Sequence, residues 1–132
     1  MNDEKYKPVV LIIDDEANIR KITAVALEGM GHETATAEDG NDALRQLAAS
    51  EFDAAFLDLR LQDENGMELL PKLLESRPGL GVIVFSAGAS PESASAAKLA
   101  GAVGFMAKPF TLEQIRQVLG SLPGGGQQPR AG

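Results

Sequence analysis

The sequence predicts an α/β fold in which helices cover both faces of a parallel sheet. Short unbroken apolar runs, such as residues 8–13 and 81–85, are typical of strands that are buried on both faces. Each run is followed by a stretch in which apolar residues recur at helical spacing. This strand–helix alternation occurs five times with short connections, which favours parallel strands joined by crossover helices.

The crossover rules leave few arrangements for such a chain. Right-handed connections are nearly universal, and the natural solution for 132 residues is one domain with a five-stranded sheet. We therefore predict a flavodoxin-like (βα)5 doubly wound parallel sheet with strand order 2-1-3-4-5.

The first half of the chain is predicted to contain strands at residues 8–13, 32–37 and 52–57. Helices are expected at residues 16–30 and from residue 39 onward, because each region carries an apolar stripe at helical spacing. The residues expected on the inner faces of these two helices are Ile19, Ile22, Ala26 and Met30, then Ala43, Leu44, Leu47 and Ala48.

A polar loop at residues 62–66 is expected to lead into the third helix. Pro71 lies inside the apolar pattern of that helix and has no N–H, so we expect either a late start near Leu69 or a local bend. The fourth strand then covers residues 81–85 and ends at Ser86.

The fourth helix is predicted at residues 90–100, with Ser90 as N-cap and Pro91 at the first helical position. Leu99 is its only large aliphatic residue, so this helix should bury little apolar area and belong to the less stable part of the fold. The fifth strand is expected at residues 102–106.

Thr111 and Gln114 have the spacing of a capping box at the start of the last helix. The apolar stripe of that helix consists of Leu112, Ile115, Val118, Leu119 and Leu122.

The composition of the chain excludes several classes of function. The chain has no cysteine, which excludes disulfides and zinc–thiolate sites, and its net charge of −7 argues against direct binding to nucleic acid. No apolar stretch is long enough for a signal peptide or a membrane span, so we expect a cytoplasmic protein without membrane contact. His32, the only histidine, is expected to be solvated or loosely packed and has no partner for a metal site.

We expect one domain at residues 7–122, with a polar N-terminal extension at residues 1–6 and a flexible Gly/Pro/Gln tail or linker at residues 123–132. A natural end, a cut before a following domain and a cloning remnant are all consistent with the tail sequence.

Chemically active residues follow four of the predicted strands. They are Asp14 and Asp15 after the first strand, Asp58 after the third, Ser86 after the fourth and Lys108 after the fifth. Ligands bind at this edge of an open α/β sheet. Each of these residues, taken alone, has a simpler interpretation. Asp58 is then only the first polar residue after a core strand, and Asp14-Asp15 is an N-cap. Ser86 is then an ordinary strand-end residue and Lys108 a surface residue.

Three carboxylates at neighbouring strand ends repel one another, at a cost of about 4 kcal/mol for two charges about 4 Å apart. Such a cluster holds either a proton or a cation, and oxygen ligands alone favour Mg²⁺, with Mn²⁺ as the alternative. An aspartate nucleophile, this cation, a lysine and a hydroxyl together make an aspartyl-phosphate site.

With these motifs in this order, the chain resembles the receiver domains of response regulators in bacterial two-component signalling, over about residues 7 to 122. The resemblance rests on Asp14-Asp15, Asp58, Ser86-Ala87 and Lys108-Pro109-Phe110, together with the spacing from Asp58 to Gly66. The two departures are Gln62, where the family often has proline, and Phe105 in place of a tyrosine.

The resemblance implies a role for each matching residue. Asp58 is the phosphoacceptor and, with Asp15 and the backbone carbonyl of Arg60, a ligand of Mg²⁺, while Asp14 acts through water. Ser86 and Lys108 contact the phosphoryl oxygens, and a cis peptide bond is expected between Lys108 and Pro109. Phe105 takes the family's aromatic switch position, with ordinary packing as the alternative.

The implied partners are a sensor histidine kinase or phosphotransfer protein, and an effector domain or partner at the face of the fourth helix, fifth strand and fifth helix. Transcriptional output and homodimerisation stay open at this point. We expect no turnover enzyme, only Mg²⁺-dependent self-phosphorylation and autodephosphorylation at Asp58.

Three rival functions fit the sequence less well. A phosphatase with an aspartyl nucleophile usually has a second acid two residues later, where this chain has Arg60. A nucleotide- or flavin-binding module would need a glycine-rich loop that does not follow the first strand. A degenerate receiver used only for protein contacts would not need the complete set of acids, serine and lysine.

Overall fold

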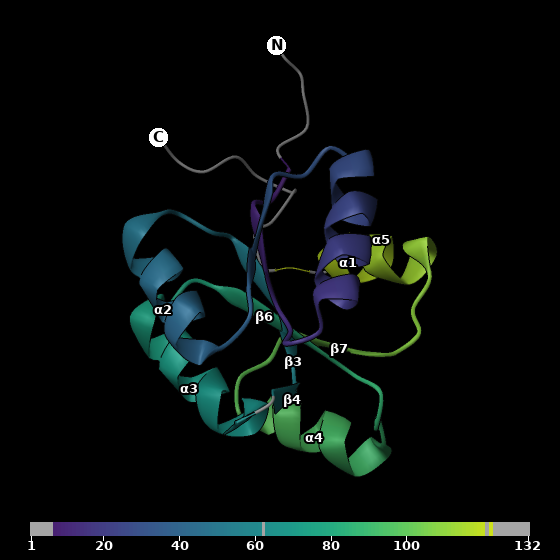
Figure 1. Cartoon of the computed structure of the whole chain (residues 1–132). Coiled ribbons are helices and arrows are strands. Elements are labelled where there is room, and N and C mark those ends of the chain that lie inside the picture. The colour runs from purple at the N-terminus through teal and green to yellow at the C-terminus, as the bar shows by residue number, and fades with distance from the viewer. Residues whose placement is uncertain (1–6, 62, 121, 123–132) are drawn as a thin grey trace.

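The structure of the chain, a computed structural model, describes residues 7–61, 63–120 and 122. Its main sheet has five parallel strands, joined in the order β2-β1-β3-β6-β7, which is the predicted 2-1-3-4-5 topology (Figure 1). The strands are β1 (Val10–Ile13), β2 (Thr34–Ala37), β3 (Ala54–Asp58), β6 (Gly81–Ser86) and β7 (Gly104–Ala107).

Five helices cover the two faces of this sheet (Figure 1). They are α1 (Ala17–Gly29), α2 (Gly40–Ala49), α3 (Gly66–Ser76), α4 (Pro91–Leu99) and α5 (Leu112–Gly120). The predicted N-terminal extension at residues 1–6, the tail at residues 123–132 and Gln62 lie outside the described residues.

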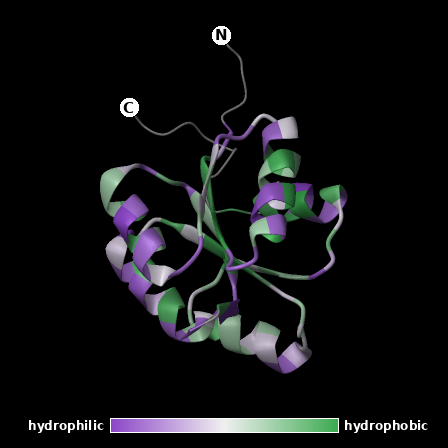
Figure 2. Ribbon diagram, viewed as in Figure 1, coloured by the Kyte–Doolittle hydropathy of each residue, from purple (hydrophilic) through white to green (hydrophobic). Residues whose placement is uncertain are grey.

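Alternate residues of each strand supply two separate hydrophobic cores. Leu11 and Ile13 of β1 face the helices α2, α3 and α4, whereas Val10 and Ile12 face α1 and α5. Hydrophobic residues are concentrated on the central strands, as Figure 2 shows. The burial of β1 on both faces explains why its sequence is an unbroken run of β-branched residues and leucine.

The inner face of α1 differs from the prediction. Ile22 is 60% exposed, and the fully buried residues of the helix are Thr23 and Leu27. Ile22 and Thr23 are consecutive and therefore lie about 100° apart around the helix, so the packing of Thr23 against the sheet turns Ile22 to the surface. Ala48 of α2 and Leu112 of α5 were also expected inside and are exposed.

Two expectations for the segment after β3 need correction. The polar loop predicted at residues 62–66 is wrong, because Glu64–Asn65 forms β5, which pairs with β4 (Arg60–Leu61) as a short antiparallel hairpin. Of the two alternatives for the third helix, the late start near Leu69 is wrong, and the local bend at Pro71 stays a prediction. The helix starts at Gly66, because the Asn65 side chain accepts a hydrogen bond from the Met67 amide and caps the helix there.

The two predicted helix starts in the second half are confirmed. Ser90 caps α4 through a hydrogen bond from the Ser93 amide. Thr111 and Gln114 form the reciprocal bonds of a capping box before α5.

Helix α4 makes little apolar contact with the rest of the domain. Ala97 is its only buried residue, and Leu99 is 89% exposed. The small area that this helix buries supports its predicted place in the less stable part of the fold.

The prediction for His32 is wrong, since this residue is only 8% exposed. Its Nδ1 lies 2.8 Å from the carbonyl oxygen of Pro8, which accepts a hydrogen bond from the ring. None of the described helices has the length and hydrophobicity needed to cross a bilayer.

Candidate functional site

The parallel strands bring the predicted acidic residues together at one edge of the sheet. Asp14 and Asp15 follow β1, and Asp58 is the last residue of the neighbouring strand β3. One carboxylate oxygen from each lies within 4.8 Å of the others. Asp14 has no exposed surface and Asp58 is 5% exposed, whereas Asp15 is half-buried. The cluster therefore combines three negative charges with little water.

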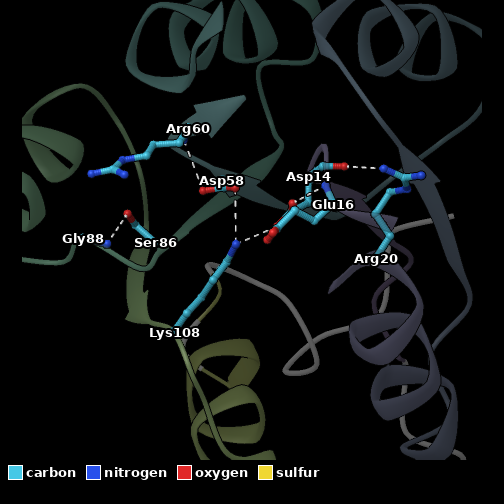
Figure 3. Close-up of polar contacts among 8 residues, drawn as sticks. All are labelled: Asp14, Glu16, Arg20, Asp58, Arg60, Ser86, Gly88 and Lys108. Carbon is cyan, nitrogen blue, oxygen red and sulfur yellow. Dashed lines mark hydrogen bonds and ion pairs between the residues drawn. The ribbon is translucent and has the colours of Figure 1, made fainter. Parts of the chain in front are cut away.

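Lys108 bridges two of these carboxylates (Figure 3). Its Nζ lies 2.8 Å from Oδ2 of Asp14 and 3.3 Å from Oδ2 of Asp58. The ammonium also lies 4.7 Å from the centre of the Phe85 ring, a distance typical of a cation–π contact. The backbone fixes Lys108 as well, because its amide donates to the Ser86 carbonyl and its bond to Pro109 is cis, as predicted.

The electrostatics of this pocket favour a neutralised cluster. Burial raises the pKa of Asp58, and the charge of Asp14 raises it further, against the opposing effects of the Arg60 amide and Lys108. Burial alone would lower the pKa of Lys108, but its bonds to Asp14 and Asp58 and their charges raise it above its ordinary value. Lys108 is therefore a permanent cation, and one lysine does not balance three carboxylates.

Backbone groups hold the carboxylates in place. The Glu16 amide donates to Oδ1 of Asp14 at 2.8 Å, and the Arg20 guanidinium donates to the Asp14 carbonyl at 2.8 Å. The Arg60 amide donates to Oδ1 of Asp58 at 3.2 Å. Both carboxylate oxygens of Asp14 are thus already engaged, one by the Glu16 amide and one by Lys108.

Ser86 forms another side of the pocket. It ends β6, is 3% exposed, and its hydroxyl accepts a hydrogen bond from the Gly88 amide at 3.2 Å. In Figure 3 Ser86 lies on the side of Asp58 away from Asp14, with its hydroxyl turned toward Gly88, and Asp58 pairs with Phe85, the residue before Ser86. Only this one hydrogen bond of the Ser86 hydroxyl lies within the part of the chain that the structure describes, so the group can still donate to a ligand.

The segment after Asp58 is tied down at two points. The Gly66 amide donates to the Leu59 carbonyl, and a Cβ at Gly66 would lie 2.5 Å from the Asp58 carbonyl oxygen, so only glycine fits there. The Glu64 carboxylate accepts a hydrogen bond of 2.7 Å from the Gly40 amide at the start of α2. These contacts hold the segment that follows Asp58 against α2.

Sequence reasoning missed two residues that shape the site. Arg20 and Glu64 were not singled out, because a single arginine in a helix and a single glutamate in a polar stretch have no distinctive spacing. Their partners are backbone atoms, the Asp14 carbonyl six residues before Arg20 and the Gly40 amide 24 residues before Glu64, and no sequence motif marks such contacts.

Comparison with known proteins identifies the family. The family described as the response regulator receiver domain matches residues 10–120. The alginate biosynthesis transcriptional regulatory protein AlgB of Pseudomonas aeruginosa is 35% identical over 107 residues, which make up 81% of this chain and 24% of AlgB. The chain belongs to the response regulator receiver domain family.

Solved structures agree with this assignment. A CheY-like response regulator receiver domain protein from Methanospirillum hungatei superimposes with a TM-score of 0.78 at 31% identity, covering 84% of this chain and 89% of that one. A response regulator from Burkholderia pseudomallei superimposes with a TM-score of 0.78 at 30% identity, covering 86% and 65%. The latter structure contains a phosphorylated aspartic acid, a calcium ion and citrate.

This receiver domain brings Asp14, Asp15, Asp58, Ser86 and Lys108 to one pocket, as their positions in the sequence predicted. The three acids form a cluster of the kind at which receiver domains bind a divalent metal ion. Its donors are carboxylate oxygens, which suit a hard cation.

Phe105 lies apart from the charged residues. It is half-buried and packs against the core that lies under α2, α3 and α4. Both interpretations, aromatic switch and ordinary packing, are compatible with this position, so its role stays a prediction.

Proposed function

We propose that this receiver domain is the phosphoacceptor switch of a two-component phosphorelay, and that Asp58 is the residue that is phosphorylated. The observation that carries the proposal is the position of Asp58. Its carboxylate lies within 4.8 Å of those of Asp14 and Asp15 and 3.3 Å from the ammonium of Lys108, and its strand β3 pairs with β6, which ends at Ser86. Phosphoryl transfer depends mainly on positioning and charge neutralisation, and these groups supply both.

In the proposed reaction an Asp58 carboxylate oxygen forms a bond to phosphorus while the bond between phosphorus and the donor's leaving group breaks. The raised pKa of Asp58 works against this step, since only the ionised carboxylate is nucleophilic. Lys108 opposes that effect by favouring the carboxylate. After transfer, Lys108 and Ser86 are suited to bind phosphoryl oxygens by charge and by hydrogen bonding respectively.

Asp15, Asp58 and the backbone carbonyl of Arg60 are the proposed ligands of Mg²⁺, or of Mn²⁺ in its place. When bound, the cation would neutralise negative charge on the carboxylates and on the phosphoryl oxygens. Both carboxylate oxygens of Asp14 already accept hydrogen bonds, which supports an outer role for Asp14 through a water molecule.

Phosphorylation of intact protein tests this proposal. The chain is incubated with acetyl phosphate and Mg²⁺, and its intact mass is measured with Asp58→Asn as the control. We expect one base-labile phosphoryl group per chain, which the variant does not acquire. If neither acetyl phosphate nor beryllofluoride produces an adduct, the proposal is wrong.

We propose that the domain is modified once per cycle and is not a turnover enzyme. Arg60 occupies the place where an aspartyl phosphatase usually has its second acid, which supports this view. Steady release of many phosphates per chain from a small phosphate ester would instead support the phosphatase.

The proposed donor is a sensor histidine kinase or a phosphotransfer protein, and the proposed output is an effector domain or partner at the α4–β7–α5 face. The chain spans about a quarter of AlgB, which is a transcriptional regulatory protein, and this supports a transcriptional effector. Homodimerisation at the same face is a further proposal, which light scattering with and without beryllofluoride would test.

A further inference from the structure

The short hairpin of β4 and β5 carries Arg60, whose backbone carbonyl is a proposed ligand of the cation. In the hairpin Arg60 lies opposite Asn65, and Leu61 lies opposite Glu64. Each strand has only two residues, and Leu61 is the one buried residue among the described positions 60, 61 and 63–65. A two-stranded hairpin is at best marginally stable by itself. The position of Arg60 therefore depends on contacts between the hairpin and the rest of the domain.

Glu64 makes such a contact, because its side chain joins the hairpin to the start of α2. Its Oε1 accepts a hydrogen bond of 2.7 Å from the Gly40 amide, which belongs to the first turn of α2 and has no acceptor within the helix. A carboxylate is favoured at this place by the charge-assisted bond and by the helix dipole. Gly40 leaves room for it, since an added Cβ there would lie 2.5 Å from Oε2 of Glu64.

This contact lies beside the acidic cluster. Glu64 lines the same cleft as Asp15, which is a proposed ligand of the cation. The hairpin follows directly on Asp58, and the Arg60 amide donates to Oδ1 of Asp58 at 3.2 Å. Glu64 thus anchors, through two paired strands, the residue that orients Asp58 and offers the carbonyl ligand. Residues that orient metal ligands commonly change the metal affinity of a site by a factor of about 10 to 100.

We propose that Glu64 is a positioning residue that sets the affinity of the pocket for its cation. It acts by anchoring the hairpin to Gly40, and not by attraction between its own charge and the cation. The anchor holds Arg60 in place before the cation arrives, so that binding does not have to order the hairpin. This inference rests on the proposed function, in which Asp15, Asp58 and the Arg60 carbonyl bind the cation.

Mn²⁺ binding to the intact, unphosphorylated chain tests the inference. Electron paramagnetic resonance measures the free Mn²⁺ in a titration and so gives a dissociation constant. We expect Glu64→Ala to raise this constant about tenfold. Glu64→Gln keeps an acceptor of the same length and loses the charge, so it should stay close to wild type. Glu64→Asp keeps the charge and is one methylene shorter, so it should resemble Glu64→Ala.

Gly40→Ala removes the same contact from the other side, because the added methyl group displaces the Glu64 carboxylate. It should weaken Mn²⁺ binding by itself and have little further effect in Glu64→Ala. Asp63→Asn is the matched control, since Asp63 is an exposed acid that lines the same cleft. This change removes an equal charge while Glu64 keeps its bond to Gly40, so the affinity should not change.

Phosphorylation by acetyl phosphate adds a second readout. The Mg²⁺ concentration that gives half of the maximal rate should rise in Glu64→Ala, while the rate at saturating Mg²⁺ stays near that of wild type. A variant that is merely unstable would lose rate at every Mg²⁺ concentration. Circular dichroism below the unfolding transition checks that each variant is folded.

If Glu64→Gln weakens Mn²⁺ binding as much as Glu64→Ala and Glu64→Asp does not, charge sets the affinity and the inference is wrong. It is also wrong if every Glu64 variant binds Mn²⁺ like wild type, and the proposed function then stands. If wild type neither binds Mn²⁺ nor forms an adduct at Asp58, the proposed function is wrong as well.

Discussion

Lys108 Nζ lies 2.8 Å from Oδ2 of Asp14, a residue with no exposed surface. Asp14 is thus the closer partner of the lysine, and Asp58 the more distant one at 3.3 Å. The ion pair is buried, so removing the lysine leaves carboxylates without their counter-charge in a medium where such charges are costly.

We predict that Lys108→Met lowers the free energy of unfolding by about 3 kcal/mol at neutral pH. The deficit should shrink as the pH falls, since the raised pKa of Asp58 lets it take up a proton early. Urea denaturation across this pH range measures both effects. Lys108→Arg keeps the charge and is the control, and an equal loss in the two variants would contradict the electrostatic explanation.

Mg²⁺ should restore more stability to Lys108→Met than to the wild type, because the cation would replace the missing positive charge. The measurement is the shift in melting temperature with added Mg²⁺, and Ca²⁺ titration provides a comparison. Equal shifts in the two proteins would contradict the view that the cation and Lys108 neutralise the same carboxylates.

Asp58→Asn should stabilise the protein at neutral pH. Because the folded-state pKa of Asp58 is raised, the folded protein binds a proton more readily than the unfolded chain, and ionised Asp58 opposes folding above that pKa. We expect a gain of about 1 kcal/mol near neutral pH that disappears at low pH, where Asp58 is protonated in both states. The exposed residue Asp63 provides the control Asp63→Asn, and equal changes in both variants would argue against the burial of Asp58 as the cause.

His32 should make stability fall as the pH drops. Burial lowers its pKa and the nearby charge of Lys7 adds to this, while the bond to the Pro8 carbonyl acts in the opposite direction. The unfolded chain therefore binds the proton more readily, so stability is lost as the pH falls below the ordinary histidine value of 6.5. His32→Asn keeps a donor for Pro8 but cannot titrate. Its unfolding free energy should depend less steeply on pH in this range, and identical slopes would refute the prediction.

Gly66→Ala should destabilise the domain, by about 2 kcal/mol or more, since its Cβ would lie 2.5 Å from the Asp58 carbonyl oxygen. Gly29→Ala is the matched control, because Gly29 is also helical and nothing lies within 4 Å of its added Cβ. That control should be neutral or slightly stabilising. Thermal unfolding of both variants makes the comparison.

Hydrogen exchange should detect a response to phosphorylation in residues 87–104. This region includes the loop after Ser86 and helix α4, which buries only Ala97. Beryllofluoride with Mg²⁺ should change its protection and leave β1 and β3 unchanged, because those strands are completely buried. Unchanged protection throughout residues 87–104 would contradict the proposed switch.

The sequence was sufficient to predict the parallel sheet and the functional residues at the ends of its strands. Strand-end positions are predictable because parallel strands all deliver their carboxyl ends to one edge, so Asp14, Asp58, Ser86 and Lys108 converge wherever the strand order is right. Helix caps such as Thr111 and Gln114 were predictable for a similar reason, since their partners are only three residues apart.

Other features depend on tertiary contacts and were not predictable. Two-residue strands such as β4 and β5 are too short to have a periodic pattern. The exposure of Ile22 follows from which side of α1 meets the sheet, and the contact of Glu64 with the Gly40 amide joins residues distant in sequence. The closer approach of Lys108 to Asp14 than to Asp58 is likewise decided only in the folded pocket.

The anchoring of the segment after Asp58 limits where a signal can leave the domain. Gly66 and Glu64 hold that segment against the backbone of Leu59 and the start of α2, whereas residues 87–89 are exposed. Information about phosphorylation should therefore travel in one direction, toward α4. A protein that docks on α2 and α3 is expected to bind both states with similar affinity, and a ligand without differential affinity shifts no equilibrium. A partner that responds to phosphorylation is therefore expected to dock on the α4 side.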